Sequence, residues 1–542
     1  SMRKLVMNLF FRNNKLDNPR YAQLQLRHYE QDSMARKSLS SLSWKSQFID
    51  GTPGDNETGG GPRQVPGACW SRVRPEPMPN PALRMWSSEV ADMLGLEIAE
   101  ERVLSGNSIV EGMDPYAQRY GGHQFGNWAG QLGDGRAITL GEVDTGKRVL
   151  ELQLKGSGKT PYSRFADGRA VLRSSIREFL CSEAMHHLGV PSTRALSLVT
   201  TGEEVVRDVM YDGRPAPEPG AIVCRVADSF IRFGSFQIHA MTGDVATLRA
   251  LVENTVRHHF HNHSADSDNG LIEWLKEVSE RTALTIAHWM RVGFVHGVMN
   301  TDNMSIHGLT IDYGPYGWLE GFDPSWTPNT TDANTKRYRY GQQAEVGAWN
   351  IARLLEAVAH LMQEPMKLND ALDSYYKAYR EHSSRMWSEK LGLGNFEEGD
   401  DNLISDLTSM LQLTETDMTI FFRLLSTIEK PEVDHLRPCF YNEGEIPSEE
   451  WNAWLARWWD RVDGAPERTA MLQANPKYVL RNWMAQLAID AAEKGDYSVA
   501  IELYEMLKNP YDEQPGHEDK WFSKRPEWAR NRIGCSMLSC SS

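Results

Sequence analysis

The sequence predicts an α+β fold with two lobes, a mixed β/α lobe followed by a mostly helical lobe. A glycine-dense stretch at residues 121–136 precedes a strand-like segment that ends at Lys155. Glu178 follows within a helical pattern, and later helical segments surround Asn303 and the Asp-x-Gly turn that begins at Asp312. This is the linear order of a two-lobed protein kinase, so we expect a kinase-like fold with N-terminal and C-terminal extensions.

Shifts in composition divide the 542 residues into four parts. Residues 1–65 are expected to form an extension and linker, because their last part is rich in Gly, Pro, Asp and Asn. Residues 66–240 are expected to form the first lobe and residues 241–400 the second. Residues 401–542 are expected to form a helical extension with a cysteine-containing tail.

The first lobe contains clear strand and helix patterns. Strands are expected at Ala137–Glu142 and Val149–Lys155, where leucines at every second position of the latter predict one buried face and leave Lys155 on the other. Apolar spacing predicts a helix over Arg169–Leu188, which a glycine and a proline then end. A strand and turn are expected over Val223–Phe236.

The second half of the chain is mostly helical by pattern. Helices are expected from about residue 245 onward, with amphipathic ones over residues 345–390 and more in the last ~140 residues. A tryptophan cluster is expected to be core rather than a ligand platform. It consists of Trp451, Trp454, Trp458 and Trp459.

Composition is that of a globular protein, with 24% charged and 40% hydrophobic residues. The net charge of −15 argues against a broad nucleic-acid-binding surface. No apolar run approaches the ~20 residues that span a bilayer, and no secretory signal is visible. Six cysteines are too few for a disulfide scaffold, so a reducing compartment is expected.

Residues 296–303 read His-Gly-Val-Met-Asn-Thr-Asp-Asn, where kinases have His-Arg/Gly-Asp-x-x-x-x-Asn. Valine at position 298 takes the place of the catalytic aspartate and cannot accept a proton. Asn303 and Asp312 keep the two oxygen ligands expected to hold Mg²⁺ or Mn²⁺. Asp302 is the nearest carboxylate that can act as a base, although an aspartate in a loop also commonly caps its own backbone. The pattern therefore favours nucleotide and metal binding without ordinary phosphoryl transfer.

Other candidate residues have both a functional and a structural interpretation. Lys155 and Glu178 match the pair that aims a lysine at nucleotide phosphates. Gly133, Gly135 and Arg136 offer close backbone approach and a fixed cation, or a tight turn. Two further cations, Arg225 and Arg232, suit a polyphosphate, but salt bridges to acidic neighbours are equally expected. The histidines at 258, 259, 261 and 263 are expected to be exposed loop residues rather than a zinc site.

Several segments together resemble the selenoprotein O family, from about Pro66 to the C-terminus. They are Gly-His-Gln-Phe-Gly at 122–126, Gln-Leu-Gly-Asp-Gly-Arg at 131–136, Leu-Gln-Leu-Lys-Gly-Ser-Gly at 152–158, Ala-Asp-Gly-Arg at 166–169, Arg-Ser-Ser-Ile-Arg-Glu-Phe-Leu at 173–180, Phe-Ile-Arg-Phe-Gly-Ser-Phe at 230–236, the 296–304 segment, and Asn-Pro-Lys-Tyr-Val-Leu-Arg-Asn at 475–482. Cys540 resembles the family's C-terminal selenocysteine position.

The resemblance implies a kinase-like protein that binds ATP in an inverted orientation and transfers AMP to Ser, Thr or Tyr hydroxyls of proteins. It implies that Asp302 is the proton acceptor, that Glu178 positions Lys155, and that Asn303 and Asp312 hold the metal. It also implies a set of nucleotide-binding residues, namely Gly133, Gly135, Arg136, Lys155, Asp167, Gly168, Arg225 and Arg232.

Two rival functions remain open from the sequence. A conventional phosphotransferase would use Asp302 as a displaced base, and a non-catalytic pseudokinase would only bind nucleotide. Cys535 and Cys540 suggest a redox switch or redox partner, or else two idle thiols in a frayed tail. The family resemblance predicts a mitochondrial location if the source is eukaryotic, which the tail favours, and a cytoplasmic one if it is bacterial.

Overall fold

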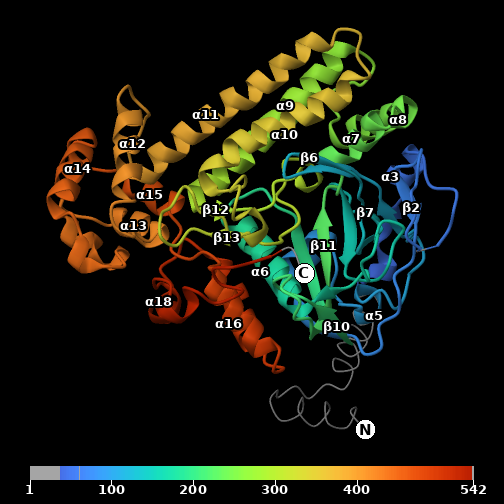
Figure 1. Cartoon of the computed structure of the whole chain (residues 1–542), viewed down its shortest axis with the longest axis horizontal. Coiled ribbons are helices and arrows are strands. Elements are labelled where there is room, and N and C mark those ends of the chain that lie inside the picture. The colour runs from blue at the N-terminus through green and yellow to red at the C-terminus, as the bar shows by residue number, and fades with distance from the viewer. Residues whose placement is uncertain (1–36, 60, 540–542) are drawn as a thin grey trace, which may run out of the picture.

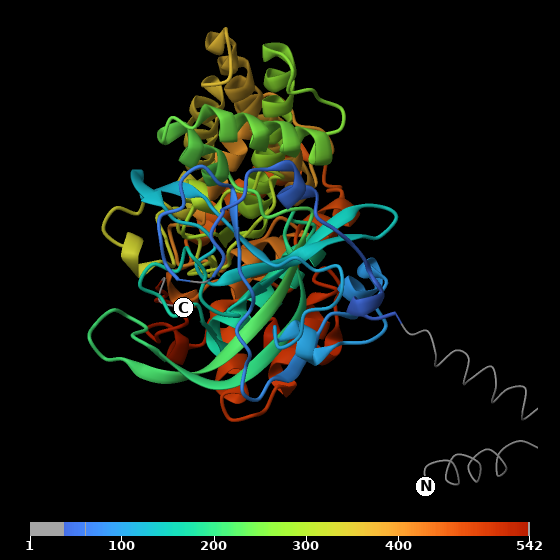
Figure 2. The ribbon, with the colours of Figure 1, turned by 90° about the vertical axis from the view of Figure 1, so that its right-hand side faces the viewer.

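A nine-stranded antiparallel sheet forms one half of the protein, and helices form the other (Figures 1 and 2). The computed structural model describes residues 37–59 and 61–539. The predictions for Cys540 and for residues 1–36 lie outside this part of the chain. The sheet consists of β1 (Ser43–Lys45), β2 (Trp70–Arg72), β3 (Ala82–Trp86), β4 (Tyr116–Gln118), β7 (Ala137–Asp144), β8 (Val149–Lys155), β9 (Ala170–Val171), β10 (Arg194–Arg207) and β11 (Ala216–Ala227).

The centre of the sheet is the strand path β4-β7-β8-β11-β10, with β2 and β3 at its ends. β1 pairs with β7, so residues before position 65 contribute to the sheet. The leucines of β8 are buried in an apolar cluster with α4 (Ser88–Leu94), as their alternation predicts. Lys155 therefore lies on the opposite face, where the candidate site is.

Helix α6 (Leu172–His187) packs against β10 and β11 and follows the predicted helix closely. Its other neighbours are α16 (Asn482–Ala492) and α17 (Ser498–Leu507), from the far end of the chain. The C-terminal part thus returns to the sheet half, and one apolar core includes residues of all three helices. The short helices α3 (Gln47–Gly51) and α5 (Glu101–Leu104) also belong to this half.

The helical half is built around α9, α10 and α11, which run side by side in Figure 1. Its remaining helices surround them or extend to one side. The helices are α7 (Phe233–Met241), α8 (Val245–His259), α9 (Asp268–Val292), α10 (Gln343–Ala359), α11 (Asn369–Leu391), α12 (Asp400–Met410), α13 (Met418–Leu425), α14 (Ser448–Arg461), α15 (Arg468–Ala474) and α18 (Pro515–Trp521). Three of the four clustered tryptophans on α14 are fully buried, which agrees with a core role.

Two local predictions were wrong. The strand expected to run with its turn to Phe236 ends at Ala227, and α7 begins at Phe233. α7 is buried all round, including its polar residues Gln237 and His239, so no apolar period distinguished helix from strand. His258 and His259 lie on α8 rather than in an exposed loop, whereas His261 is exposed in the turn after α8, as predicted, and His263 contacts Glu277 at 2.5 Å. Among the described residues, none of this histidine run belongs to a group with metal-ligand spacing.

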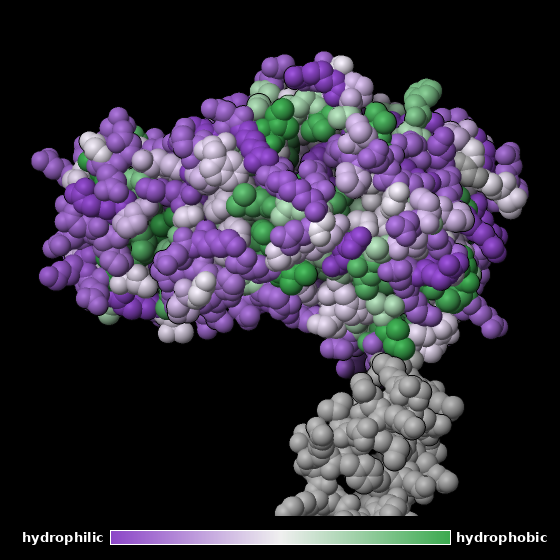
Figure 3. Space-filling view, turned by 90° about the horizontal axis from the view of Figure 1, so that it is seen from below, coloured by the Kyte–Doolittle hydropathy of each residue, from purple (hydrophilic) through white to green (hydrophobic). Residues whose placement is uncertain are grey.

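The surface of the protein is mixed in character. On the face seen from below, hydrophobic side chains occur in small groups separated by hydrophilic ones (Figure 3). Within the described residues, no helix combines the length and apolar character that a membrane crossing requires. The β10–β11 hairpin projects from the sheet half (Figure 2).

Candidate active site

A cavity of about 880 Å³ lies between the sheet and the helical half. Its walls come from β7, β8 and β11, from the loop at 162–169, and from the segments at 298–303 and 312–315. Seven cationic side chains and four carboxylates line it, in a chain whose net charge is −15. A local excess of cations in an acidic protein favours a polyanionic ligand. The charged lining residues are Arg136, Lys155, Arg164, Arg169, Arg207, Arg225, Arg232, Asp134, Asp167, Asp302 and Asp312.

Lys155 lines the cavity, and Glu178 lies behind it and contacts it. Lys155 ends β8, and its Nζ lies 2.6 Å from Oε2 of Glu178 on α6. The carboxylate is buried, yet Lys155 and Arg225 hold its pKa below the usual value, against the effect of burial. A charged glutamate on a helix packed against the sheet fixes the lysine where it can reach a ligand.

Arg225 and Arg232 converge on Asp312. Arg225 Nη1 lies 2.6 Å from Asp312 Oδ1 and 3.0 Å from Oε1 of Glu178, and Arg232 pairs with Oδ2 of Asp312. Burial alone would raise the pKa of Asp312, but the two arginines and Lys155 hold it well below its ordinary range. Both arginines are buried, so they are preorganised rather than free to reach solvent. Arg225 and Arg232 therefore line the pocket as cations and also form salt bridges, so both interpretations of these residues hold.

The backbone at Asp312 is left-handed, with φ of 57°. For a residue other than glycine this conformation is uncommon and is often held in place at a functional site. Arg225 and Arg232 hold the Asp312 side chain, and its carbonyl accepts from the N–H of Gly314 at 2.8 Å. The surroundings thus maintain the strained geometry that aims this carboxylate into the cavity.

Asp302 lies in the short helix η2 (Thr301–Asn303) and is 7% exposed. Its Oδ2 accepts from Gln124 Nε2 at 3.1 Å, while its buried Oδ1 has no hydrogen-bond partner among the described residues. Burial raises the pKa of Asp302 to about 6. A side chain at Gly122 would meet Oδ1 within 2.3 Å, so only glycine allows this close approach. The arrangement gives Asp302 the raised pKa and the free oxygen that suit a general base.

Val298 lines the cavity in the place where kinases have their catalytic aspartate. Its carbonyl accepts from Asn303 Nδ2 at 2.9 Å. This bond fixes the amide of Asn303 and leaves its side-chain oxygen available. His296 Nε2 donates to Ile311 O at 2.9 Å, which ties the loop to the segment that carries Asp312.

Asn303 and Asp312 fit a divalent cation. Both border the cavity and offer hard oxygen atoms. Each carboxylate oxygen of Asp312 accepts from one arginine, and a carboxylate oxygen has two lone-pair sites, so acceptor capacity remains. Two oxygen donors of this kind suit a divalent cation that takes its remaining ligands from water or from a bound ligand.

Gly133 and Gly135 line the cavity beside Arg136, and close packing requires a glycine at both positions. A side chain at Gly133 would meet the Tyr162 ring within 2.5 Å, and one at Gly135 would meet Tyr162 O at 2.9 Å. The N–H of Gly135 donates to Gly133 O at 2.8 Å. Close packing of this turn against Tyr162 therefore explains the glycines, and Arg136 is the residue of the three that brings charge to the cavity.

Asp167 and Gly168 lie at the mouth of the cavity, apart from the buried cations. Asp167 forms two bonds with Arg207 of β10, at 2.7 and 2.9 Å. Gly168 has φ of 75° and approaches the backbone of Gly158 so closely that a side chain would clash at 2.3 Å. The mouth is also lined by two strongly exposed aromatic residues, Phe165 and Tyr211.

Sequence reasoning missed Gln124, Arg207 and Tyr162 as site residues. Gln124 had a visible signal, since it lies in the Gly-His-Gln-Phe-Gly segment at 122–126. Arg207 had none, because its role depends on the pairing of β10 with β11 and on the loop that carries Asp167.

The last described residues connect the two halves beside the cavity. Leu538 N donates to Pro328 O at 3.1 Å, and Thr330 N donates to Leu538 O at 2.8 Å. Ser539 Oγ donates to Val209 O on the β10–β11 hairpin. Cys535 is buried and burial raises its pKa to about 11, which opposes thiolate formation.

Comparisons with known proteins identify the family of the chain. A sequence model of the family described as "Protein adenylyltransferase SelO" matches residues 63–508. A protein of Aromatoleum aromaticum named "Protein nucleotidyltransferase YdiU" is 53% identical over 524 residues, covering 93% of this chain and all of the relative. Relatives of the same name from Azoarcus sp. and Xanthomonas campestris pv. campestris are 52% and 54% identical, each with 93% of this chain and all of the relative covered. The chain therefore belongs to the SelO family of protein adenylyltransferases.

Proposed function

We propose that the protein transfers AMP from ATP to Ser, Thr or Tyr hydroxyls of other proteins and releases pyrophosphate. We further propose that it does so on a two-lobed kinase-like fold, with lobes at residues 66–240 and 241–400. The observation that carries the proposal is the pair Val298 and Asp302. The usual base position is apolar, while a buried carboxylate with a free oxygen lies four residues later.

The charge distribution supports an inverted nucleotide. Arg225 and Arg232 are the deepest cations, with side chains 2% and 1% exposed, and Lys155 and Arg136 lie beside them. Terminal phosphates placed there would meet the greatest positive charge. The nucleoside would then lie toward Asp167 and Gly168 at the mouth, and the α-phosphorus between, near Asp302.

Asn303 and Asp312 would hold Mg²⁺ or Mn²⁺ there. When bound, the ion would neutralise phosphate charge and favour pyrophosphate as a leaving group. The chain's own cations supply the rest of the electrostatic stabilisation, and they need little reorganisation because they are already fixed by Glu178 and Asp312.

Asp302 performs the proton step in this proposal. Its carboxylate accepts the proton of the acceptor hydroxyl as the oxygen attacks the α-phosphorus. The bond from the α-phosphorus to the bridging oxygen breaks, and its electron pair leaves with pyrophosphate. Positioning of the hydroxyl and the phosphorus provides much of the rate, because the protein forms no covalent bond of its own.

ATP labelled at either phosphorus tests the proposal. We expect label from the α-phosphorus, and none from the γ-phosphorus, to appear on acceptor proteins in a bacterial lysate. Transfer from the γ position alone would indicate a conventional phosphotransferase. Equal α-label transfer by Asp302→Ala, Asp312→Ala and the surface control Asp401→Ala would remove the assigned roles, and no transfer with tight ATP binding would indicate a pseudokinase.

The partners in this proposal are proteins with accessible hydroxyls. The relatives named above are bacterial, so they give no support to a mitochondrial location. No described contact supports a redox partner at Cys535.

A further inference from the structure

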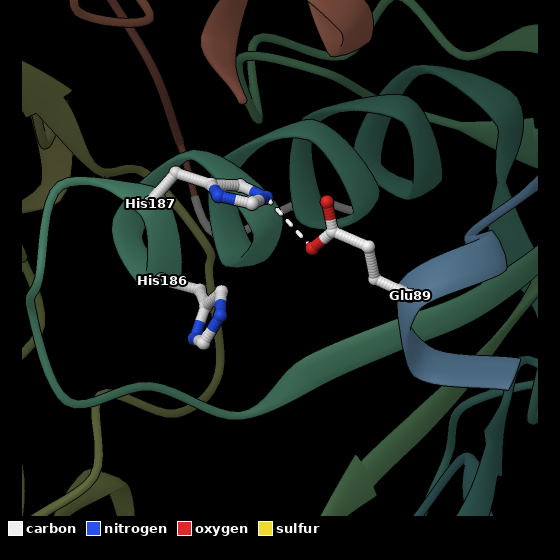
Figure 4. A group of neighbouring side chains, drawn as sticks. All are labelled: Glu89, His186 and His187. Atoms are coloured by element: carbon white, nitrogen blue, oxygen red, sulfur yellow. Dashed lines mark ion pairs between the residues drawn. The ribbon is translucent and has the colours of Figure 1, made fainter. Parts of the chain in front are cut away.

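A second group of metal-ligating side chains lies outside the nucleotide cavity. Glu89 projects from α4 toward the last turn of α6, where His186 and His187 are adjacent (Figure 4). One ligand atom from each residue lies within 4.8 Å of the others. None of the three lines the nucleotide cavity.

The contact between Glu89 and His187 is close but is not a hydrogen bond. Nε2 of His187 lies 3.2 Å from Oε2 of Glu89. That nitrogen is shielded from solvent and has no hydrogen-bond partner among the described residues. The two groups therefore face each other as an ion pair would if the imidazole were protonated, and a metal ion between them would also satisfy both.

The spacing matches a tetrahedral metal. Bonds of about 2.0–2.2 Å to nitrogen and oxygen place neighbouring ligand atoms roughly 3.3 Å apart. Glu89 and His187 already have this separation, at 3.2 Å. His186 is exposed, and its ring lies 5.0 Å from that of His187, so side-chain rotation can bring its nitrogen closer.

The surrounding charges permit a cation. Arg194 is the nearest cation, but two 2.8 Å bonds pair it with Glu183, and its contact with Glu89 is longer, at 3.4 Å. Lys508 also faces the group and pairs with Glu505.

We propose that Glu89, His186 and His187 bind one Zn²⁺ ion or a similar transition metal, with water as the fourth ligand. Two imidazoles and one carboxylate suit Zn²⁺ better than Mg²⁺, which prefers oxygen ligands alone. The ion would connect α4 to α6, the helix that also carries Glu178. This site is therefore distinct in place and chemistry from the proposed catalytic metal site.

Calorimetric titration of the full chain with Zn²⁺, in excess Mg²⁺, tests the proposal. We expect one Zn²⁺ per chain, with affinity reduced at least about tenfold in Glu89→Gln, His186→Ala and His187→Gln. His258→Ala, which changes a histidine elsewhere, and Asp312→Asn, which changes the catalytic site, should bind Zn²⁺ as the wild type does.

Two further measurements separate loss of the site from loss of the fold. Without Zn²⁺, Glu89→Gln and His186→Ala should melt at the wild-type temperature, and Zn²⁺ should raise the melting temperature of the wild type but not of these two variants. Co²⁺ should give the visible absorption of a four-coordinate ion in the wild type and not in His187→Gln. Absence of Zn²⁺ binding by the wild type, or unchanged binding by all three variants, would overturn the proposal.

Discussion

Gln124 Nε2 donates a hydrogen bond of 3.1 Å to Oδ2 of Asp302, although the two residues are 178 positions apart. The glutamine is on β5 (Gly121–Gln124), which pairs with β6 (Asn127–Gln131) in a small hairpin over the cavity. This bond occupies one carboxylate oxygen and leaves the other free. Gln124 thus orients the proposed base.

Adenylyl transfer should rise with pH through about 6 in the wild type, because burial raises the pKa of Asp302 to about 6 and the base must be ionised. Gln124→Leu keeps the volume but removes a hydrogen bond to the charged form, so this limb should shift to higher pH. The pH profile of kcat/KM measures the shift. The surface variant Gln412→Leu should leave the profile unchanged, and an unshifted limb in Gln124→Leu would show that Gln124 does not tune the base.

Asp302→Asn should abolish transfer and yet stabilise the folded protein at pH 8. An acid whose folded pKa is raised from 3.8 to about 6 binds more protons folded than unfolded, so ionisation opposes folding above pH 6. The shift in pKa corresponds to about 3 kcal/mol of the free energy of unfolding, which the wild type loses as the pH rises from about 4 to 6. Thermal melting at pH 8 and pH 4 measures it. An equal difference between variant and wild type at both pH values would contradict the prediction.

Arg225→Lys should weaken ATP use while the protein stays folded. One guanidinium group bonds Glu178, Asp312 and Gln153 at once, which a single ammonium group cannot reproduce. Loss of one charged hydrogen bond is worth about 1.5–3 kcal/mol, which predicts a roughly ten- to hundredfold lower kcat/KM for ATP. Arg173→Lys, which disturbs a pair with Glu218 outside the cavity lining, should keep normal ATP kinetics.

Truncation after Cys535 should reduce both stability and activity. It removes the bonds of Leu538 to Pro328 and Thr330. The neighbouring Asn329 donates to Gly297 O at 3.0 Å, so the tail supports the loop that carries Asp302. Limited proteolysis and transfer assays measure the effect. Truncation after Ser539 keeps these contacts and should behave as the wild type; equal behaviour of both truncations would refute the supporting role.

The local elements and the chemical character of the site were predictable from the sequence. Alternating leucines predicted β8 and placed Lys155 on the face opposite the leucines, because a strand turns successive side chains to opposite sides. The apolar repeat over Leu172–His187 predicted α6, and motif spacing placed Asn303 and Asp312 near one another. These features depend on residues that are close together in the chain, so a local sequence pattern is enough to predict them.

Tertiary structure alone decided the partners of those residues. Gln124 reaches Asp302, Arg225 reaches Asp312, and the C-terminal segment reaches the β10–β11 hairpin across long stretches of sequence. The burial that raises the pKa of Asp302 and the ion pair of Arg225 with Asp312 are likewise properties of the assembled fold. The sequence determined which groups are present and on which elements, and packing determined which atoms meet, because hydrogen bonds and desolvation act over a few ångströms in space.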